Sequence, residues 1–245
     1  MRILGIIPAR YGSSRFPGKP LIDLKGKTMI RRVVEGAAKS SLLTDLVVAT
    51  DDIRIVDEVS GFGGKVMLTD AKHPTGTDRC AEIVRTLSET YDVVINIQGD
   101  EPLVDAKQLD QLLQAFNDPN VQIATLASRK IGMEDIVNPN RIKVVVDKNH
   151  SALYFSRSPI PNFANAKGEP LEIYPFLRHI GLYAYRSDIL LQLSELEETK
   201  LEQIESLEQL RWLYNGYAIR VVETEIETPN IDTPEDVDKV LALIS

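Results

Sequence analysis

Short apolar runs of strand length alternate with amphipathic stretches through the first half of this 245-residue chain. The amphipathic stretches carry apolar residues at helical spacing, for example Met29, Val33 and Ala37, which predicts helices. Because the runs between them are almost continuously apolar, we expect an α/β fold with a mostly parallel sheet covered on both faces. Five runs are predicted as strands: Ile3–Pro8, Leu46–Thr50, Lys65–Thr69, Val93–Gln98 and Gln122–Ala127.

The second half departs from this alternation. Its segment Ser158–Pro175 is rich in Pro, Asn and Gly, which predicts a long loop or arm over a binding site or at a subunit contact. No repeat or linker divides the chain, so we expect one domain over residues 1–245. Further strands are expected at Ile142–Asp147, Ala152–Ser156, Ile180–Tyr185 and Ala218–Glu223, with helices near Ser187–Ser194, Ser206–Leu213 and Pro234–Leu243.

Composition excludes several classes of protein. No stretch approaches the roughly 18 consecutive apolar residues of a membrane span, and the apolar run at the start is too short for a signal peptide. We therefore expect a cytoplasmic protein with no membrane partner. The single cysteine, Cys80, excludes an intramolecular disulfide and a Cys-rich zinc site. Its place on a predicted apolar helix stripe indicates a core residue.

Basic residues are concentrated near the N-terminus. Residues 1–32 hold eight Lys or Arg and one acidic residue, although the whole chain carries a formal net charge of −8. A compact basic segment on an acidic body suits a small polyanion such as a nucleoside triphosphate. Nucleic-acid binding favours a wider basic face and a basic isoelectric point, so we expect no nucleic-acid partner.

The loop Pro8–Pro20 follows the first predicted strand, at the end of a parallel sheet where ligands bind. Its glycines permit close backbone approach, and its serines and cations supply donors and charge. A Walker A loop needs four residues between its glycines and Ser or Thr after the Lys, but here five residues intervene and Pro20 follows Lys19. The nicotinamide fingerprint G-x-G-x-x-G is also missing from the sequence. The loop therefore predicts a triphosphate site of another kind.

An acidic turn follows the strand predicted at Val93–Gln98. Asp100 and Glu101 come directly after Gly99, and carboxylate oxygens are ligands that Mg²⁺ prefers alongside phosphate oxygens and water. Asp100 is therefore a candidate magnesium ligand. The alternative is an acidic turn that caps the following helix, a role that Asp105 could equally fill.

Several short motifs form an ordered series over almost the whole chain. They are Ile7–Leu21, Val48–Asp52, Gly76–Arg79, Gln98–Pro102, Asn138–Asn140, Lys143–Val145, Ala152–Arg157, Arg178–Tyr183, Glu205–Arg211 and Asp232–Asp236. In these motifs the chain resembles the CMP-Kdo synthetases, the 3-deoxy-manno-octulosonate (Kdo) cytidylyltransferases. One block, His73–Thr77, departs from the family pattern, because it carries Pro-Thr where a polar residue and Ser are usual.

The resemblance implies a Rossmann-like sheet of the nucleotidyltransferase or glycosyltransferase-A type, with a smaller inserted β-rich part for sugar binding and dimerisation. Residues 1–130 would be mainly nucleotide-binding, 131–220 mainly sugar-binding and dimer-forming, and 221–245 would supply a strand, a metal ligand and a helix. It implies a nucleotidyltransferase that couples CTP to the anomeric C2 hydroxyl of Kdo. The products would be CMP-Kdo, for lipopolysaccharide biosynthesis, and pyrophosphate, and the enzyme would be a homodimer.

The resemblance also implies the role of individual residues. Lys19, Asp100 and Asp232 would be catalytic, with the two aspartates as ligands of Mg²⁺. The triphosphate would be held by Arg10, Ser13, Ser14, Arg15 and Lys19. The cytosine and ribose would be bound by Pro8, Ala9, Thr75, Gly76, Thr77 and Arg79. The sugar would be contacted by Gln98, Arg157, His179, Tyr183, Glu208 and Gln209.

Other functions remain open at this point. The same chemistry could act on a related sugar acid, such as 8-amino-Kdo or a sialic acid, because only a few side chains near Arg157–Arg178 would need to differ. A non-catalytic nucleotide-binding module is a further alternative, which predicts CTP binding without turnover. His179 could also be an ordinary strand residue.

Overall fold

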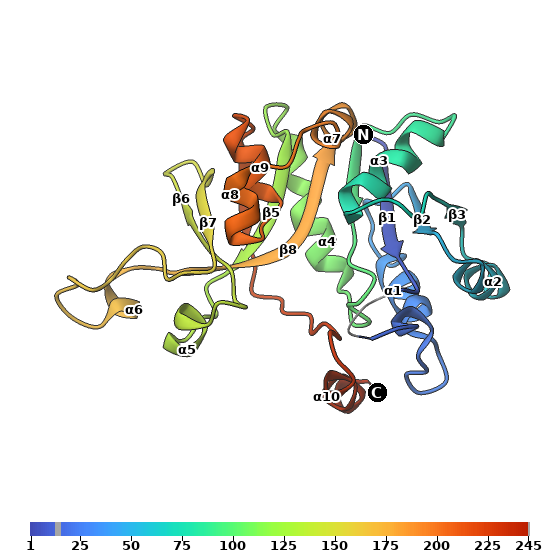
Figure 1. Cartoon of the computed structure of the whole chain (residues 1–245), viewed down its shortest axis with the longest axis horizontal. Helices are drawn as coiled ribbons and strands as arrows, with labels where there is room; N and C mark the ends of the chain where they lie inside the picture. The colour runs from blue at the N-terminus through green and yellow to red at the C-terminus, as the bar shows by residue number, and fades with distance from the viewer. Residues whose placement is uncertain (13–15, 245) are drawn as a thin grey trace. The chain divides into compact units, whose positions relative to one another are not determined.

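The computed structural model describes residues 1–12 and 16–244 (Figure 1). Its internal contacts separate the chain into two compact units, which are described in turn. Unit 1 comprises Met1–Asp110 and Glu227–Ser245, and unit 2 comprises Gln111–Ile226. Unit 2 is therefore an insertion, in sequence, between the two segments of unit 1.

Unit 1 contains a parallel sheet in the order β3-β2-β1-β4. Its strands are β1 (Ile3–Ala9), β2 (Asp45–Thr50), β3 (Val66–Leu68) and β4 (Val93–Asn96). They are the first four strands predicted from the sequence, with bounds that differ by one or two residues. Between them lie α1 (Met29–Ala37), α2 (Ile53–Gly61) and α3 (Gly76–Thr86), while α4 (Ala106–Leu113) follows β4 and leads into unit 2.

The helices α1, α2 and α3 form where the sequence supplies both an apolar stripe and a side chain that caps the first turn. In α1 the hydroxyl of Thr28 accepts a hydrogen bond from the backbone N–H of Arg31, which satisfies one of the otherwise unpaired donors of the first turn. Met29, Val33 and Ala37 are then buried on one face. Cys80 of α3 is fully buried, so the expectation that it is a core residue is confirmed.

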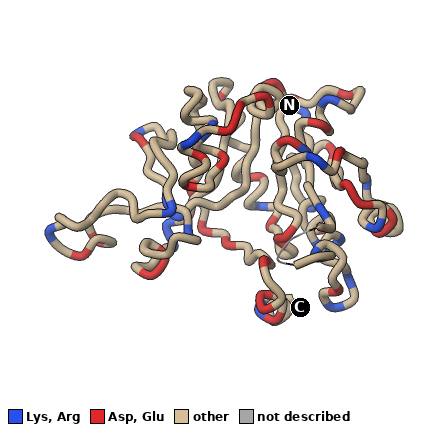
Figure 2. Tube along the Cα trace, in the orientation of Figure 1, with Lys and Arg blue, Asp and Glu red and all other residues tan. Residues whose placement is uncertain are grey.

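The C-terminal segment is part of the core of unit 1. It contains the helix α10 (Glu235–Leu243), whose Val240 is buried together with Ile231, Leu24 and Met29. Figure 2 shows acidic residues gathered on α10 and basic residues in the loop that precedes α1. The loop that precedes α1 and the helix α10 thus carry opposite charges, and they contribute to one apolar cluster although they lie near opposite ends of the sequence.

Unit 2 is built on a mixed sheet. Its central strand β5 (Ile123–Ser128) pairs in parallel with β9 (Ile219–Glu223) and antiparallel with β8 (Leu177–Arg186). The hairpin of β6 (Lys143–Val146) and β7 (Ala152–Ser156) joins β8 through β6. The pairing of β5 with β8 is interrupted by a bulge between Thr125 and Leu126.

The described part of unit 2 also contains six short helices. They are the 3₁₀ helix η2 (Gln114–Asn117) and the helices α5 (Met133–Val137), α6 (Pro170–Ile173), α7 (Ser187–Leu193), α8 (Lys200–Glu205) and α9 (Gln209–Tyr214). The α6 turn lies in the segment predicted as an arm. Across the part of the chain that is described, no helix is long and apolar enough to cross a membrane.

The helix predicted near Ser206–Leu213 is present as α9, but it begins only at Gln209. The short helix α8 before it was not predicted, and it ends at Glu205 because Ser206 adopts a left-handed backbone conformation with φ 51°. The start of α8 is marked by a capping box, in which Thr199 and Glu202 each accept from the backbone of the other. That signal was present in the sequence and was overlooked.

Candidate functional site

The central feature of unit 1 is a contact between three distant segments of the chain. The ammonium group of Lys19 donates to Oδ2 of Asp100 at 2.9 Å and to the backbone carbonyl of Ile231 at 2.8 Å. The backbone N–H of Ile231 in turn donates to the carbonyl of Asp100 at 2.9 Å. This arrangement places Asp232, the next residue, beside the turn that carries Asp100.

Glycine is required for the close packing of this region. A Cβ at Gly99 would lie 2.6 Å from the carbonyl oxygen of Pro8, so any other residue would push the turn after β4 away from the end of β1. Gly18 has a positive φ of 73°, and its N–H donates to the carbonyl of Tyr11 at 2.9 Å. These two glycines hold the loop after β1 and the turn after β4 in place.

The predicted triphosphate residues lie on this loop. Arg10 is exposed, and the side chain of Lys19 is only 12% exposed. Ser13, Ser14 and Arg15 lie outside the described residues. Of the predicted set, Lys19 is thus the residue whose contacts tie the loop to the candidate metal ligands.

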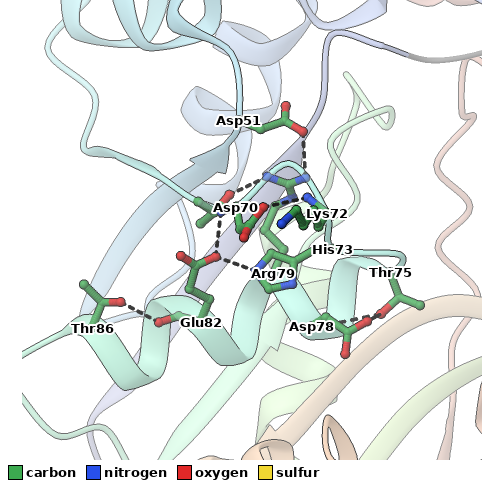
Figure 3. Close-up of polar contacts among 10 residues, drawn as sticks. Asp51, Asp70, Lys72, His73, Thr75, Asp78, Arg79, Glu82 and Thr86 are labelled. Carbon is green, nitrogen blue, oxygen red and sulfur yellow. Dashed lines mark hydrogen bonds and ion pairs between the residues drawn. The ribbon is translucent and has the colours of Figure 1, made fainter. Parts of the chain in front are cut away.

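Two of the residues predicted to bind cytosine and ribose, Thr75 and Arg79, are shown with their polar contacts in Figure 3. Arg79 is 4% exposed, and its guanidinium donates to Asp51 at 3.0 Å and to the hydroxyl of Thr69. Thr75 caps α3, because its hydroxyl accepts from the N–H of Asp78 at 3.1 Å. These contacts anchor the start of α3, so Arg79 acts in this structure as a link between α3 and the end of β2.

The remaining members of that set surround the start of α3 and the end of β1. Thr77 and Ala9 are buried, whereas Pro8 is half-buried. A Cβ added to Gly76 would be 3.5 Å from Cγ of Pro8, which shows that Gly76 and Pro8 are neighbours. The structure therefore brings the two predicted segments of the nucleotide site together.

The residues present fit a divalent cation. Asp100 and Asp232 offer carboxylate oxygens on two segments joined by a backbone hydrogen bond, and Oδ2 of Asp232 accepts from the amide of Asn230 at 2.6 Å. Within residues 1–12 and 16–244 there is no group of three or more His, Cys, Asp or Glu that could hold a metal. Two carboxylates with phosphate oxygens and water is a donor set that Mg²⁺ accepts.

Glu101 is a further acidic residue at this turn. Burial raises the pKa of Glu101 to about 7. The hydrogen bond that Glu101 accepts from the hydroxyl of Thr228 at 2.8 Å lowers this pKa, but by less than burial raises it. This bond ties the turn a second time to the C-terminal segment. Glu101 is a residue for which the sequence predicted no role.

In unit 2, Arg157 is held by backbone carbonyls. Its Nε donates to the carbonyl of Glu205 at 2.7 Å, and its two terminal nitrogens donate to Pro139 at 3.0 Å and to Ser206 at 3.2 Å. The carboxylate of Glu205 accepts from the backbone N–H of Arg157 at 2.9 Å instead of from its guanidinium. The guanidinium is thus oriented by neutral acceptors.

Lys143 supports the same region and was not assigned a role from the sequence. Its ammonium group is completely buried and donates to the carbonyls of Asn138, Arg141 and Arg157 at 2.9, 2.6 and 2.6 Å. Burial lowers the pKa of Lys143. A buried ammonium that binds three carbonyls fastens together the chain segments on either side of Arg157.

His179 and Tyr183 lie on β8 with aromatic neighbours. Nε2 of His179 is 3.0 Å from the hydroxyl of Thr125, and its ring is 5.0 Å from that of Phe155 and 5.4 Å from that of Tyr183. Burial, with the nearby charge of Arg178, lowers the pKa of His179 to about 3, so its imidazole is neutral at pH 7.

Two buried polar atoms near these residues make no hydrogen bond to the described chain. They are Nε2 of Gln209 and Nε1 of Trp212. The ring of Trp212 packs 5.1 Å from that of Tyr183, and Trp212 is a core residue with 1% of its surface exposed. Because buried polar groups normally have partners, these atoms are available to water or to a polar ligand.

The predicted sugar-contacting residues are divided between the units. Gln98 follows β4 in unit 1, whereas the others belong to unit 2. In unit 2 the structure brings His179 and Tyr183 together on β8, and Gln209 lies in α9 next to Glu208. Glu208 is half-buried at the start of α9.

Comparisons with known proteins show the class of this protein. A family model described as Cytidylyltransferase matches residues 4–225. The chain is therefore a nucleotidyltransferase.

Individual proteins that are similar to this chain identify the family within this class. Two similar proteins are both named 3-deoxy-manno-octulosonate cytidylyltransferase. The one from Parabacteroides distasonis is 50% identical, and the match covers 100% of this chain and 99% of that protein. The one from Bacteroides thetaiotaomicron is 51% identical, and the match covers 96% of this chain and 95% of that protein. A solved structure of a CMP:2-keto-3-deoxy-manno-octonic acid synthetase complexed with CTP has a TM-score of 0.92 and 44% identity, with 99% of this chain and 98% of that one covered. The chain belongs to the 3-deoxy-manno-octulosonate cytidylyltransferase family.

Proposed function

We propose that this chain transfers CMP from CTP to the anomeric C2 hydroxyl of Kdo and releases pyrophosphate. The observation that carries the proposal is the contact of Lys19 with Asp100 and with the carbonyl of Ile231, which assembles a cation and two acidic residues at the end of a parallel sheet. The relatives named for Kdo and the similar structure complexed with CTP support the two substrates. They also favour Kdo over the other sugar acids and over a non-catalytic module.

The reaction exchanges one phosphorus–oxygen bond for another. The C2 hydroxyl oxygen bonds to the α-phosphorus of CTP, the bond from this phosphorus to the bridging oxygen of the β-phosphate breaks, and the hydroxyl proton is released. Both reactants are anions, so catalysis depends mainly on their positioning and on neutralisation of charge at the phosphate oxygens. A bound Mg²⁺ would supply positive charge between phosphate and sugar acid, with Asp100 and Asp232 as its protein ligands.

The cations of the chain have donors left for the substrates. The ammonium of Lys19 has three N–H donors and uses two of them in the contacts described above, so the third can bind a phosphate oxygen. The guanidinium of Arg157 has five donors and spends three on backbone carbonyls. The remaining two can bind a carboxylate, which gives Arg157 the role of holding the sugar acid within unit 2.

The test is a substrate panel with the purified full-length chain. We expect pyrophosphate release with CTP, Mg²⁺ and Kdo, together with a CMP-sugar product detected by mass spectrometry. Sialic acid and 8-amino-Kdo are tested in parallel, with UTP and ATP as nucleotide controls. Turnover with another sugar acid but not Kdo would refute the substrate, whereas CTP binding without turnover of any acid would favour the non-catalytic module.

We further propose that the enzyme is a cytoplasmic homodimer, uses Mg²⁺ and serves lipopolysaccharide biosynthesis, as the resemblance implies. Support for a subunit contact comes from large apolar side chains that are exposed on unit 2, with Leu153 at 62%, Val137 at 58% and Ile173 at 54%. Light scattering tests the dimer, chelation of divalent ions tests the metal, and cell fractionation tests the location. Loss of the lipopolysaccharide inner core on depletion of the protein tests the pathway.

A further inference from the structure

Thr125 occupies an irregular position in the sheet of unit 2. Along β5 and β8, Thr125 pairs with Tyr183, whereas the next residue, Leu126, pairs with Ile180. The register of β8 against β5 therefore shifts by two residues at this point, which is a β-bulge. The side chain of Thr125 is completely buried at this bulge.

The hydroxyl of Thr125 interacts with the hydroxyl of Tyr183 and has three further polar neighbours on β8. Its Oγ1 lies 2.9 Å from the carbonyl oxygen of Leu182, 3.2 Å from that of Ile180 and 3.0 Å from Nε2 of His179. All three distances are within hydrogen-bond range. The side-chain hydroxyl of Thr125 therefore connects β5 to β8 at the bulge.

The number of protons favours one direction for these bonds. A hydroxyl has one proton and accepts with its lone pairs, whereas a carbonyl oxygen only accepts. If Thr125 gave its proton to Nε2, its lone pairs would face both carbonyl oxygens, whereas donation to Leu182 leaves only the more distant carbonyl of Ile180 facing a lone pair. The less repulsive arrangement therefore has Thr125 donating to Leu182 and Nε2 of His179 donating a proton to Oγ1.

The other nitrogen of His179 is then a hydrogen-bond acceptor. A neutral imidazole carries one proton, so protonation at Nε2 leaves a lone pair on Nδ1. Nδ1 has no hydrogen bond to any described residue. Burial of His179 keeps the ring neutral around pH 7. The rings of Phe155 and Tyr183 hold it from two directions.

We propose that Thr125 is a positioning residue that fixes His179 in the Nε2–H tautomer, so that Nδ1 accepts a hydrogen bond from a hydroxyl group of the sugar acid. The part of this proposal that concerns the sugar acid rests on the proposed function. A neutral acceptor attracts a hydroxyl and repels a carboxylate. The site would thereby orient the substrate, with its hydroxyl toward His179 and its carboxylate toward a cation such as Arg157.

The tautomer can be measured without substrate. The chain has three histidines, so ¹⁵N NMR spectra of the wild type and of His179→Gln are enough to assign the signals of residue 179. We expect a protonated Nε2 and an unprotonated Nδ1, unchanged between pH 7 and 5. A protonated Nδ1 in the wild type would overturn the proposal, whatever the enzyme does with Kdo.

The role in binding is tested by two substitutions and a control. Thr125→Val removes the hydroxyl and keeps the shape, whereas Thr125→Ser keeps the hydroxyl. Thr224→Val is the matched control, because Thr224 is also a buried threonine of unit 2, and its hydroxyl accepts only from the backbone N–H of Ile226 among the contacts described. All three are assayed for KM with each substrate and for the tautomer.

For Thr125→Val we expect loss of the single tautomer and a rise of about tenfold in KM for the sugar acid, the size of one lost hydrogen bond. KM for CTP should stay within about twofold, because the nucleotide residues belong to unit 1. Thr125→Ser should retain the tautomer, and Thr224→Val should leave both KM values unchanged. An unchanged sugar-acid KM in Thr125→Val would refute the proposal.

If Thr125→Val does not fold, the wild-type and Thr125→Ser spectra decide the question. If the wild type turns over no sugar acid, the proposed function fails while the tautomer is still tested.

Discussion

Replacement of Asp100 by Asn separates the structural role of this carboxylate from its chemical role. The change removes the charge and keeps the shape, and the amide oxygen can still accept from Lys19, whose ammonium lies 2.9 Å away. The loss is therefore the difference between a charge-assisted and a neutral hydrogen bond, about 1–2 kcal/mol of unfolding free energy. For a chain of this size we expect the melting temperature to fall by roughly 2–8 °C.

The effect on turnover should be far larger than the effect on stability. A neutral amide oxygen is a poor substitute for a carboxylate ligand, and it leaves the charges of phosphate and sugar acid less well compensated. We expect kcat for CTP and Kdo to fall by at least about a hundredfold. Pyrophosphate release at increasing Mg²⁺ concentrations measures the activity, and calorimetry measures the melting temperature.

Asp45→Asn is the matched control. Asp45 also binds a lysine, Lys65, and accepts from the hydroxyl of Tyr91 at 2.9 Å, but it lies at the start of β2, the opposite end of the strand from the nucleotide residues. It should lose comparable stability and retain its activity. Wild-type kcat and KM in Asp100→Asn would refute the reasoning, because the acidic turn would then have only a structural role.

Three further predictions follow from individual side chains. Lys19→Met keeps the aliphatic stem but loses the ammonium, so we expect kcat/KM for CTP to fall by at least about tenfold, with weaker CTP binding by calorimetry. Lys143→Met leaves three carbonyls without their donor and should lower the unfolding free energy by about 3–5 kcal/mol, measured in urea; a loss below about 1 kcal/mol would contradict the buried contacts. His179 has a pKa of about 3 when folded and 6.5 when unfolded, so the unfolded chain binds more protons between these values and stability falls as the pH drops through this range. Between pH 7 and 5 its contribution should fall by about 2 kcal/mol, and His179→Gln should abolish this part of the pH dependence.

Local patterns in the sequence were enough for most of the elements. Runs of β-branched residues predicted the strands of both units, because a strand buried on both faces must be apolar throughout. The cation-rich loop after β1 and the acidic turn after β4 were predicted for a similar reason, since the ends of parallel strands are where ligands bind. The helix α8 was missed, because its six residues, Lys200–Glu205, are too few to show the helical spacing of apolar residues.

The contacts that define the site were decided by tertiary structure alone. Lys19 meets Asp100 across 81 positions of sequence and the carbonyl of Ile231 across 212. Asp232 follows no strand directly, since β9 ends at Glu223, and it reaches the acidic turn through the backbone bond of Ile231 to Asp100. The proton on His179 depends likewise on a bulge that pairs Thr125 with an irregular stretch of β8. Residue spacing reports which face of an element is apolar, but which backbone carbonyl lies opposite a given side chain is determined only when distant segments pack together.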